Sequence, residues 1–409
     1  MINWINFFHI YQPPNWPLHI IKKVASESYR PLLKILKNNK RLKVTLNISG
    51  SLTEQLVEYK MTDIIRDIKL LANKQQIELV GSALYHPILP LIPEREITRQ
   101  VQLNHKINKK YFGSVFNPKG FFSPEMCYSY ALAKNIEKLG YQWMIIDEIS
   151  ARGQLGKINF DRGYQLKNSR LNIIFRNRNV SDYFSFHCNP NYPEGFWKKI
   201  QEDGRNNEYL ITAMDGENLG HHRKGLDRFW LKLANDGRIS TMTISELLKK
   251  YRQTVKITPV KASWSSREIE VKNNIPYILW KDPDNPVHAL QWQLVNKLIY
   301  LVYKSKKHKN YQTARDLLDK RLASDQFWWA AAKPWWSLPI IKRKAGEMWF
   351  LASLLQKDTT NYDSLVSQII SRATRWQNSD KYKKVADQYL AAYNDVRYIG
   401  GKKIAPTRS

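Results

Sequence analysis

The sequence predicts an α/β protein in which a β/α barrel is followed by an α-helical bundle. Short apolar runs alternate with helix-like segments over roughly the first 245 residues, and the pattern becomes helical throughout after a long irregular connection. Strands that alternate with helices indicate parallel βαβ units. Seven or eight such units favour a closed or nearly closed barrel, although the pattern alone leaves an open doubly wound sheet as an alternative.

Eight apolar runs are the expected strands. They are INFF (5–8), KVTLNI (43–48), IELVGS (77–82), GFF (120–122), QWMII (142–146), LNIIF (171–175), YLITAM (209–214) and STMTI (240–244). Helix-like segments lie between most of them, for example 18–39, 94–112 and 129–140. The last of these carries Gly140 where a helix would stop.

The expected domain organisation has four parts. A catalytic barrel covers 1–255, an irregular connection that contributes to the active site covers 256–285, a helical domain covers 286–400, and a flexible tail covers 401–409. Within the helical domain, the apolar positions of VHALQWQLVNKLIYLVYKSKK follow three- and four-residue steps, as on one face of a helix.

The composition indicates a globular protein with a large positive charge. The 409 residues carry a formal net charge of +29, from 65 Lys and Arg against 36 Asp and Glu, and 43% are hydrophobic. The basic residues are scattered over unrelated segments that match no nucleic-acid-binding signature, so we expect no specific nucleic-acid partner. No stretch approaches the roughly 18 apolar residues of a membrane helix, so no membrane span is expected.

The cysteines and the N-terminal stretch favour a cytoplasmic protein. Cys127 and Cys188 are too few for a disulfide framework or a four-cysteine zinc site, and they fit a reducing compartment. The stretch MINWINFFHIYQPP lacks the basic start and the small-residue cleavage site of a signal peptide. The sequence gives no expectation for the oligomeric state.

Polar residues follow most of the expected strands. In a parallel barrel the loops at the C-terminal ends of the strands build the active site, so these residues would converge on one crevice. They are His9, Gln12, His86, Glu125, Asp147, Glu148, Arg176, Ser181, Asp182, Asp215 and Glu217. Several carboxylates in one crevice suit glycoside hydrolysis, in which one carboxylate attacks or guides water and another protonates the leaving oxygen.

Each of these residues taken alone has a structural explanation. Asp215 could cap the N-terminus of a helix, and Glu125 could occupy the first turn of the helix that follows Pro124. His9 and His86 stand beside aromatic and proline residues and could be buried structural histidines. Only their joint placement at strand ends indicates a site.

Other catalytic chemistries find little support. His221 and His222 are consecutive, so they point in different directions on a helix, and no HExxH or HxxxH spacing occurs. We therefore expect no metal and no cofactor. Ser/His/Asp catalysis lacks a GxSxG elbow, and no GxxxxGK phosphate loop is present.

Four tryptophans fall within ten positions, in FWWAAAKPWW at 327–336. They are Trp328, Trp329, Trp335 and Trp336. Aromatic faces stack on the apolar faces of sugar rings, which favours exposure toward a carbohydrate. Packing in the core of the bundle is the equal alternative.

Five ordered segments resemble glycoside hydrolase family 57, the amylase-like retaining enzymes. They are FHIYQPP, GSALYHPILPLIP, GFFSPEMCYS, AMDGENLGHH, and the later SWSS with ASDQFWWA. The resemblance implies an incomplete seven-stranded β/α barrel with a helical C-terminal region. It also implies that Glu125 is the nucleophile and Asp215 the general acid/base.

The resemblance extends to residues that would contact the sugar. They are His9, Gln12, His86, Arg176, Asp182, Glu217 and Trp264, with His222 as a weaker candidate and Trp328 added as a stacking residue. Two motifs depart from the family pattern: in the first, Tyr11 stands where a second histidine is common, and in the third, Phe122 and Ser123 stand where tryptophan or a second proline is common.

The expected function is a retaining α-glycosidase of the α-amylase type that acts on α-glucan through a covalent glycosyl-enzyme. A 4-α-glucanotransferase or glucan branching enzyme of the same family is the alternative within this chemistry. A metal-dependent polysaccharide deacetylase and a non-catalytic glycan-binding protein are alternatives of other classes.

Overall fold

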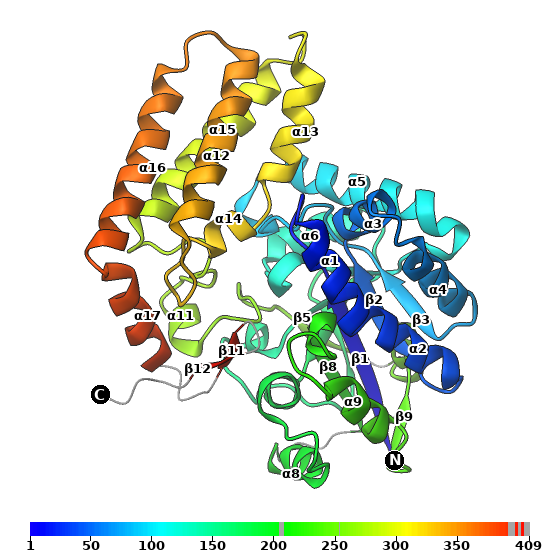
Figure 1. Cartoon of the computed structure of the whole chain (residues 1–409). Helices are drawn as coiled ribbons and strands as arrows, with labels where there is room; N and C mark the ends of the chain where they lie inside the picture. The colour runs from blue at the N-terminus through cyan, green and yellow to red at the C-terminus, as the bar shows by residue number, and fades with distance from the viewer. Residues whose placement is uncertain (204–207, 253, 392–396, 400–401, 405–409) are drawn as a thin grey trace. The chain divides into compact units, whose positions relative to one another are not determined.

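The computed structural model of the chain contains two compact units (Figure 1). It describes residues 1–203, 208–252, 254–391, 397–399 and 402–404. The first unit comprises Met1–Leu84, Leu89–Val271 and the last two strands, and the second comprises Tyr85–Ile88 and the helical residues from Lys272 onward.

The first unit holds every strand found among the described residues. They are β1 (Ile2–Ile10), β2 (Val44–Ile48), β3 (Ile77–Val80), β4 (Gly120–Phe122), β5 (Trp143–Asp147), β6 (Gly163–Leu166), β7 (Asn172–Arg176), β8 (Tyr209–Asp215), β9 (Ile239–Thr241), β10 (Thr254–Ile257), β11 (Arg397–Ile399) and β12 (Lys402–Ile404). One sheet has the order β3-β2-β1-β8, with β9 also paired to β1, and a second has the order β10-β6-β7-β5-β4.

Two short seams join these sheets into a barrel. Gly81 and Phe121 form a parallel bridge between the ends of β3 and β4. On the other side, the N–H of Asn177, just after β7, donates to the carbonyl of Ile211 in β8 at 2.8 Å. Seven strands thus surround one interior and pair in parallel within each sheet. They are β1, β2, β3, β4, β5, β7 and β8. The predicted incomplete seven-stranded β/α barrel is confirmed.

The eighth expected strand, 240–244, is shorter than predicted and lies outside the ring. Its first residues belong to β9, which pairs with the start of β1, and the helix α10 begins at Ile244. Strands β6 and β10 were not predicted. Their sequences, GYQL and TVKI, carry no long apolar run; β6 pairs antiparallel with β7, and the side chains of β10 are partly exposed.

Helices lie between the strands of the first unit. They are α1 (Leu18–Val24), α2 (Arg30–Asn38), α3 (Gly50–Glu58), α4 (Thr62–Asn73), α5 (Glu94–Phe112), α6 (Tyr130–Lys138), α7 (Arg178–Asp182), α8 (Glu194–Glu202), α9 (Leu226–Ala234), α10 (Ile244–Lys250) and α11 (Glu268–Lys272). A π-helical turn, η1 (Ala25–Tyr29), divides the expected helix 18–39 into α1 and α2. Pro31 has no N–H to give to the carbonyl of Glu27, which explains why regular α-helical bonding is interrupted there.

The apolar interior is built from alternating large side chains. Trp4 and Trp230 are fully buried, and their indole N–H groups donate to Thr212 at 2.9 Å and to Asn6 at 3.0 Å. Gly120 in β4 leaves room for the ring of Trp143, which a Cβ atom would meet at 2.0 Å. These contacts fix the strands whose ends carry the site.

The second unit is a helical bundle. Its helices are α12 (Pro286–Lys304), α13 (Tyr311–Arg321), α14 (Asp325–Trp328), α15 (Leu338–Leu355), α16 (Thr360–Asn378) and α17 (Lys381–Ala391). The side chain of Asn285 caps α12 by accepting the N–H of Val287 at 2.9 Å. The predicted C-terminal helical bundle is confirmed.

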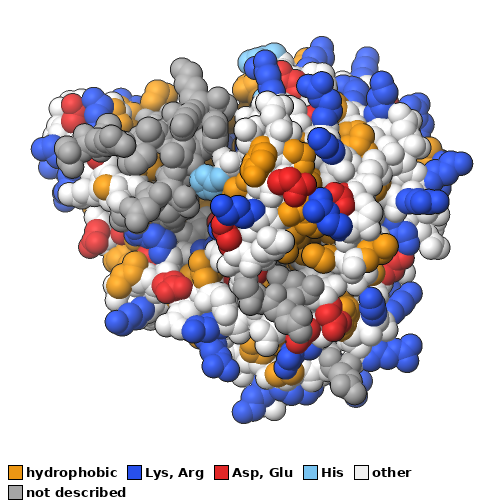
Figure 2. All heavy atoms as spheres, turned by 90° about the horizontal axis from the view of Figure 1, so that it is seen from below, with side chains coloured by type: hydrophobic (Ala, Val, Ile, Leu, Met, Phe, Trp, Pro, Cys, Tyr) orange, Lys and Arg blue, Asp and Glu red, His pale blue; other side chains and the backbone are white. Residues whose placement is uncertain are grey.

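The expected tail, 401–409, is described only over β12, which pairs with β11 in antiparallel fashion. Residues 401 and 405–409 lie outside the described part of the chain. Among the helices that are described, none combines the length and the apolar character needed to cross a membrane. On the face drawn in Figure 2, Lys and Arg side chains are spread among hydrophobic and acidic ones.

Candidate active site

Glu125 stands on a tight turn directly after β4. The turn, Pro124–Met126, holds Glu125 at φ 59° and ψ 19°, a left-handed conformation that is uncommon for residues other than glycine. The first turn of a helix, the structural alternative, is wrong because α6 begins only at Tyr130. The left-handed turn instead presents the carboxylate beside Trp264.

Trp264 binds Glu125 twice. Its indole N–H donates to Oε2 of Glu125 at 2.8 Å, and its backbone N–H donates to the Glu125 carbonyl at 3.2 Å. A donor aimed at a carboxylate favours the ionised form and fixes its orientation. The similarity-based prediction placed Trp264 against the sugar, and the structure adds this direct contact with the predicted nucleophile.

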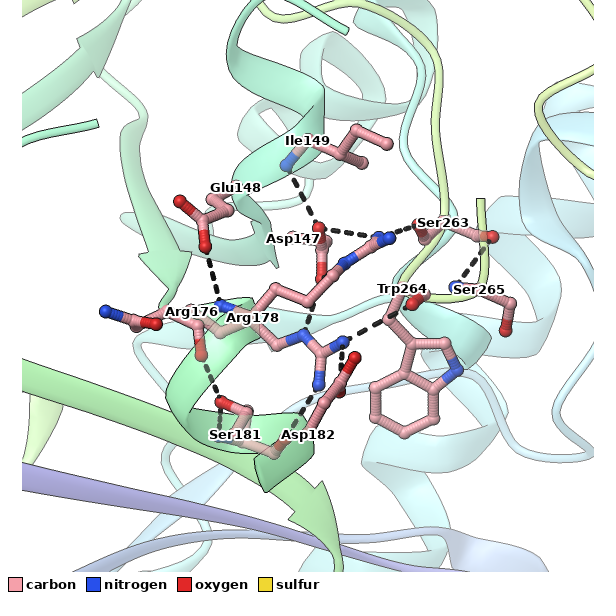
Figure 3. A network of polar contacts seen from close by, with 12 residues as sticks. Asp147, Glu148, Ile149, Arg176, Arg178, Ser181, Asp182, Ser263, Trp264 and Ser265 are labelled. Carbon is pink, nitrogen blue, oxygen red and sulfur yellow. Dashed lines mark hydrogen bonds and ion pairs between the residues drawn. The ribbon is translucent and has the colours of Figure 1, made fainter. Parts of the chain in front are cut away.

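A buried ion cluster holds the loop that carries Trp264 (Figure 3). Asp147, at the end of β5, is fully buried and pairs with Arg176 at 2.5 Å and Arg178 at 2.7 Å. The guanidinium of Arg178 also donates to the carbonyls of Ser263 at 3.0 Å and Ser266 at 2.5 Å. Buried charges need such partners, and this pairing fixes the loop.

Arg176 connects this cluster to the predicted acid. It donates to the carbonyls of Ala213 at 3.1 Å and Trp264 at 3.3 Å, and it pairs with Asp182 at 3.2 Å (Figure 3). Its guanidinium lies 5.7 Å from the centre of the Trp264 ring. The positive charge also favours the ionised form of Asp215.

Asp215 is the last residue of β8 and is opposite His9 in the β1–β8 register. Burial raises its pKa from 3.8 to about 6, against the opposing effect of Arg176. The helix-cap alternative is not what the structure contains: the side chain caps nothing in the turn that follows, and α9 begins at Leu226 after Gly225. A half-buried carboxyl with a raised pKa can carry a proton for transfer.

His9 is buried between polar and aromatic groups. Its Nδ1 lies 2.7 Å from Oδ1 of Asn47, whose amide donates to the carbonyl of Val80 at 3.2 Å. Because Oδ1 can only accept, the His9 proton is on Nδ1, and Nε2 is the acceptor. Burial lowers the His9 pKa to about 4, so the ring is neutral, and it stacks on Phe122 at 4.5 Å.

Glu217 is buried two residues after Asp215. Its Oε1 accepts the Tyr29 hydroxyl, the side-chain amide of Gln12 at 3.2 Å and the backbone N–H of Tyr11 at 3.2 Å. Burial and the neighbouring charge of Asp215 raise the Glu217 pKa to about 7, and the hydrogen bonds from Tyr29 and from backbone donors oppose this rise.

His222 joins this group through the backbone, since its N–H donates to the Glu217 carbonyl at 2.9 Å. Burial lowers its pKa to about 4. The neighbouring His221 pairs with Glu27 at 2.6 Å. Within the described part of the chain, no three His, Cys, Asp or Glu side chains gather in a way that could hold a metal ion.

Two predicted sugar contacts, His86 and Trp328, belong to the second unit. His86 is 3% exposed, and its Nδ1 lies 3.0 Å from the Ser324 hydroxyl. Trp328 is half-buried and packs on Trp335 at 4.3 Å and Trp329 at 5.2 Å. The tryptophans of 327–336 are therefore neither fully buried nor fully exposed, and the sugar-contact roles of both residues stay predictions.

Several residues that shape the site were not singled out from the sequence. Asn47 and Arg178 fix His9 and the Trp264 loop, and Tyr29 binds Glu217. Asn47 gives a faint signal, because it is a polar residue inside an apolar strand. Tyr29 gives none, because it lies within a segment of ordinary helical periodicity.

A family comparison agrees with this arrangement. The sequence model of glycosyl hydrolase family 57 matches residues 2–260. The chain belongs to glycosyl hydrolase family 57. The β/α barrel and the strand-end carboxylates all lie within the matched region.

Relatives at the level of sequence include α-amylases. The α-amylase of Pyrococcus abyssi is 31% identical over 265 residues, which are 61% of this chain and 39% of that protein. The α-amylase of Pyrococcus horikoshii is 28% identical over 261 residues, 61% of this chain and 41% of that protein. The chain thus spans about two fifths of the length of these relatives.

The family fold extends over most of the chain. A branching enzyme from Pyrococcus horikoshii superposes with a TM-score of 0.70 at 16% identity, covering 91% of this chain and 94% of that one. An exo-type maltose-forming amylase from Pyrococcus sp. ST04 superposes with a TM-score of 0.59 at 14% identity, covering 96% and 83%. These likenesses establish the family architecture.

Proposed function

We propose that this chain is a retaining α-glycosidase of the α-amylase type that acts on α-glucan, with Glu125 as nucleophile and Asp215 as general acid/base. The single observation that carries the proposal is the environment of Trp264. Its indole donates to Glu125, lies 6.4 Å from the ring of His9, which is opposite Asp215, and lies 5.7 Å from the guanidinium of Arg176. The indole thus contacts Glu125 directly and lies near His9 and Arg176, two neighbours of Asp215.

The two carboxyl groups differ in the way that retaining hydrolysis requires. Glu125 accepts a hydrogen bond from Trp264, which favours an ionised nucleophile, whereas burial keeps Asp215 protonated to higher pH. In the first step Glu125 attacks the anomeric carbon, the glycosidic bond breaks, and Asp215 gives its proton to the leaving oxygen. In the second step Asp215 takes a proton from water, which displaces Glu125 and restores it.

The neighbouring residues would hold the sugar in the −1 position. The His9 ring is neutral and its orientation is fixed by Asn47, so it would meet a sugar hydroxyl in a defined geometry. Asp182 and Glu217 are acceptors for further hydroxyls, and Arg176 balances the negative charges of Asp182 and Asp215. Gln12, His86, His222 and Trp328 remain in the proposed set of sugar contacts.

Transfer to a second sugar uses the same covalent intermediate. It is the alternative because 4-α-glucanotransferases are also among the relatives, including one from Thermococcus litoralis that is 26% identical over 147 residues. A cytoplasmic location is proposed on the two buried free thiols, Cys127 and Cys188.

The deciding experiment follows the first products by NMR. The purified protein is incubated with maltooligosaccharides, and the anomeric configuration and chain length of the products are recorded against time. We expect α-configured products first, with mutarotation later. Chains longer than the substrate would favour the transferase. Release of acetate from an acetylated polysaccharide in a chelator-sensitive manner would replace the proposal with deacetylation, and tight glucan binding without turnover would replace it with a binding role.

A further inference from the structure

The strand that ends in Asp215 is paired along one edge only. Strand β8 pairs with β1 from Tyr209 to Asp215. On its other edge it approaches the end of β7, and within the described part of the chain no strand ladder joins β8 to β7. An edge without a ladder leaves buried N–H and C=O groups that need other hydrogen-bond partners.

Side chains from the end of β7 and from α7 take the place of a ladder at this edge (Figure 3). Nη1 of Arg176 donates to the carbonyl of Ala213 at 3.1 Å. The N–H of the same residue donates to the hydroxyl oxygen of Ser181 at 3.1 Å. Both polar backbone groups of the buried Ala213 are therefore held by side chains, two residues before Asp215.

The hydroxyl of Ser181 has a defined direction. It is buried and lies 2.5 Å from the carbonyl of Asn177. Because a carbonyl can only accept, the hydroxyl proton points at Asn177, and a lone pair of the oxygen is left for the N–H of Ala213. Asn177 is fixed in turn, since its side chain caps α7 by accepting the N–H of Val180 at 3.0 Å. Ser181 thus links β8 to the capped start of α7.

We propose that Ser181 is a positioning residue that fixes the end of β8 and, through it, the place of the Asp215 carboxyl. This inference rests on the proposed role of Asp215 as the general acid/base. Side chains two residues apart in a strand lie on the same side, so a shift of the backbone at Ala213 moves Asp215 as well. Proton transfer needs the carboxyl within hydrogen-bond reach of the leaving oxygen, so it is sensitive to such a shift.

The test compares two serine variants. Ser181→Ala removes the hydroxyl that accepts the N–H of Ala213. Ser185→Ala is the matched control, because Ser185 is also buried, lies four residues further along in the π-helical turn η6 (Tyr183–His187), and donates to the side chain of Met214 at 3.4 Å rather than to the backbone of β8.

The value of kcat/KM is measured for each variant on two substrates. One is a maltooligosaccharide, whose leaving oxygen needs a proton, and the other is an α-glycosyl fluoride, which departs without one. For Ser181→Ala we expect a loss of about 10- to 100-fold on the maltooligosaccharide and a much smaller loss on the fluoride. Ser185→Ala should affect both substrates equally or neither. Equal losses in Ser181→Ala, or no loss, would overturn the inference.

A second readout does not depend on activity. Amide hydrogen exchange over β8, followed by mass spectrometry, should be faster in Ser181→Ala than in the unaltered protein and in Ser185→Ala, because the N–H of Ala213 has lost its acceptor. Unchanged exchange in Ser181→Ala overturns the inference whatever the activity.

Asp215→Asn separates a failure of this inference from a failure of the proposed function. If Asp215→Asn distinguishes the two substrates and Ser181→Ala does not, only the role of Ser181 is overturned. If Asp215→Asn loses both activities equally, the acid role of Asp215 is overturned, and the inference with it. If Ser181→Ala does not fold, Ser181→Cys is read by the same two measurements, since a thiol fills the space but is a weak donor and acceptor.

Discussion

The indole N–H of Trp264 donates to Oε2 of Glu125 at 2.8 Å, across 139 positions of sequence. The loop that makes this contact is held through its carbonyls by Arg176 and Arg178, which both pair with the buried Asp147. The orientation of the predicted nucleophile therefore depends on the ion cluster that holds this loop.

Removing the indole donor should slow the reaction without unfolding the protein. Trp264→Phe keeps an aromatic ring beside His9 but leaves Oε2 of Glu125 without this donor. A hydrogen bond to a charged group is worth about 1.5–3 kcal/mol, so kcat/KM on maltooligosaccharides should fall about 10- to 100-fold. Trp349→Phe, whose indole bonds to Asp363 at the surface of the second unit, is the matched control. Equal kcat/KM values for the two variants would show that the Trp264 hydrogen bond plays no part in the reaction.

Weakening the ion cluster should affect both stability and rate. Arg178→Lys keeps one positive charge near Asp147 but cannot reach the Ser263 and Ser266 carbonyls together. We expect the free energy of unfolding in urea to fall by about 1–3 kcal/mol and kcat to fall as well. Arg238→Lys changes an exposed arginine paired with Asp236 and should alter neither quantity. An unchanged kcat in Arg178→Lys would mean that the position of Trp264 does not depend on the ion cluster.

The acid/base role of Asp215 predicts a dependence on the leaving group. Asp215→Asn should lower kcat/KM about 10²- to 10⁴-fold on maltooligosaccharides, whose leaving oxygen needs a proton. The loss should be much smaller on an α-glycosyl fluoride, which departs without one. In the unaltered protein, kcat/KM should fall as pH rises through about 6, because the proton is then lost from Asp215. Equal losses on both substrates would show that Asp215 does something other than give a proton.

The same substitution should stabilise the fold at alkaline pH. The Asp215 pKa is raised from 3.8 to about 6 in the folded protein, so the stability that its protonated form contributes is fully present below 3.8 and is lost as pH rises through about 6. Asparagine stays neutral at every pH. We expect Asp215→Asn to gain about 1–3 kcal/mol in unfolding free energy at pH 8 and nothing near pH 3.5. If Asp215→Asn were less stable than the unaltered protein at pH 8, the ionised Asp215 carboxylate would not destabilise the fold, and this prediction would be wrong.

The barrel was predictable because its signal is local. Each strand of the ring carries an apolar run long enough to be recognised, and the residues at the strand ends, such as Glu125 and Asp215, follow from the rule that loops at the C-terminal ends build the site. Strands β6 and β10 lie outside the ring and were missed because neither carries a long apolar run, and β10 is also poorly buried.

The contacts that tune the site were not predictable because they join distant segments. Tyr29 is 188 positions from Glu217, and its role depends on a π-helical turn that interrupts an otherwise regular helix pattern. Arg178 begins a short helix directly after Asn177, where nothing in the sequence distinguishes a buried arginine from a solvated one. Such roles emerge only when the strands have set the separations between the loops.

Covalent capture of the intermediate tests the central claim most directly. Asp215→Asn is incubated with an α-glycosyl fluoride of a maltooligosaccharide, quenched and digested with trypsin, and the peptides are weighed by mass spectrometry. The peptide 120–134, GFFSPEMCYSYALAK, contains Glu125 as its only acidic residue. We predict that its mass increases by one glycosyl group, and that Glu125→Gln acquires no label. A glycosyl group on the peptide that contains Asp215 and Glu217, or on no peptide during turnover with inversion at the anomeric carbon, would contradict the account.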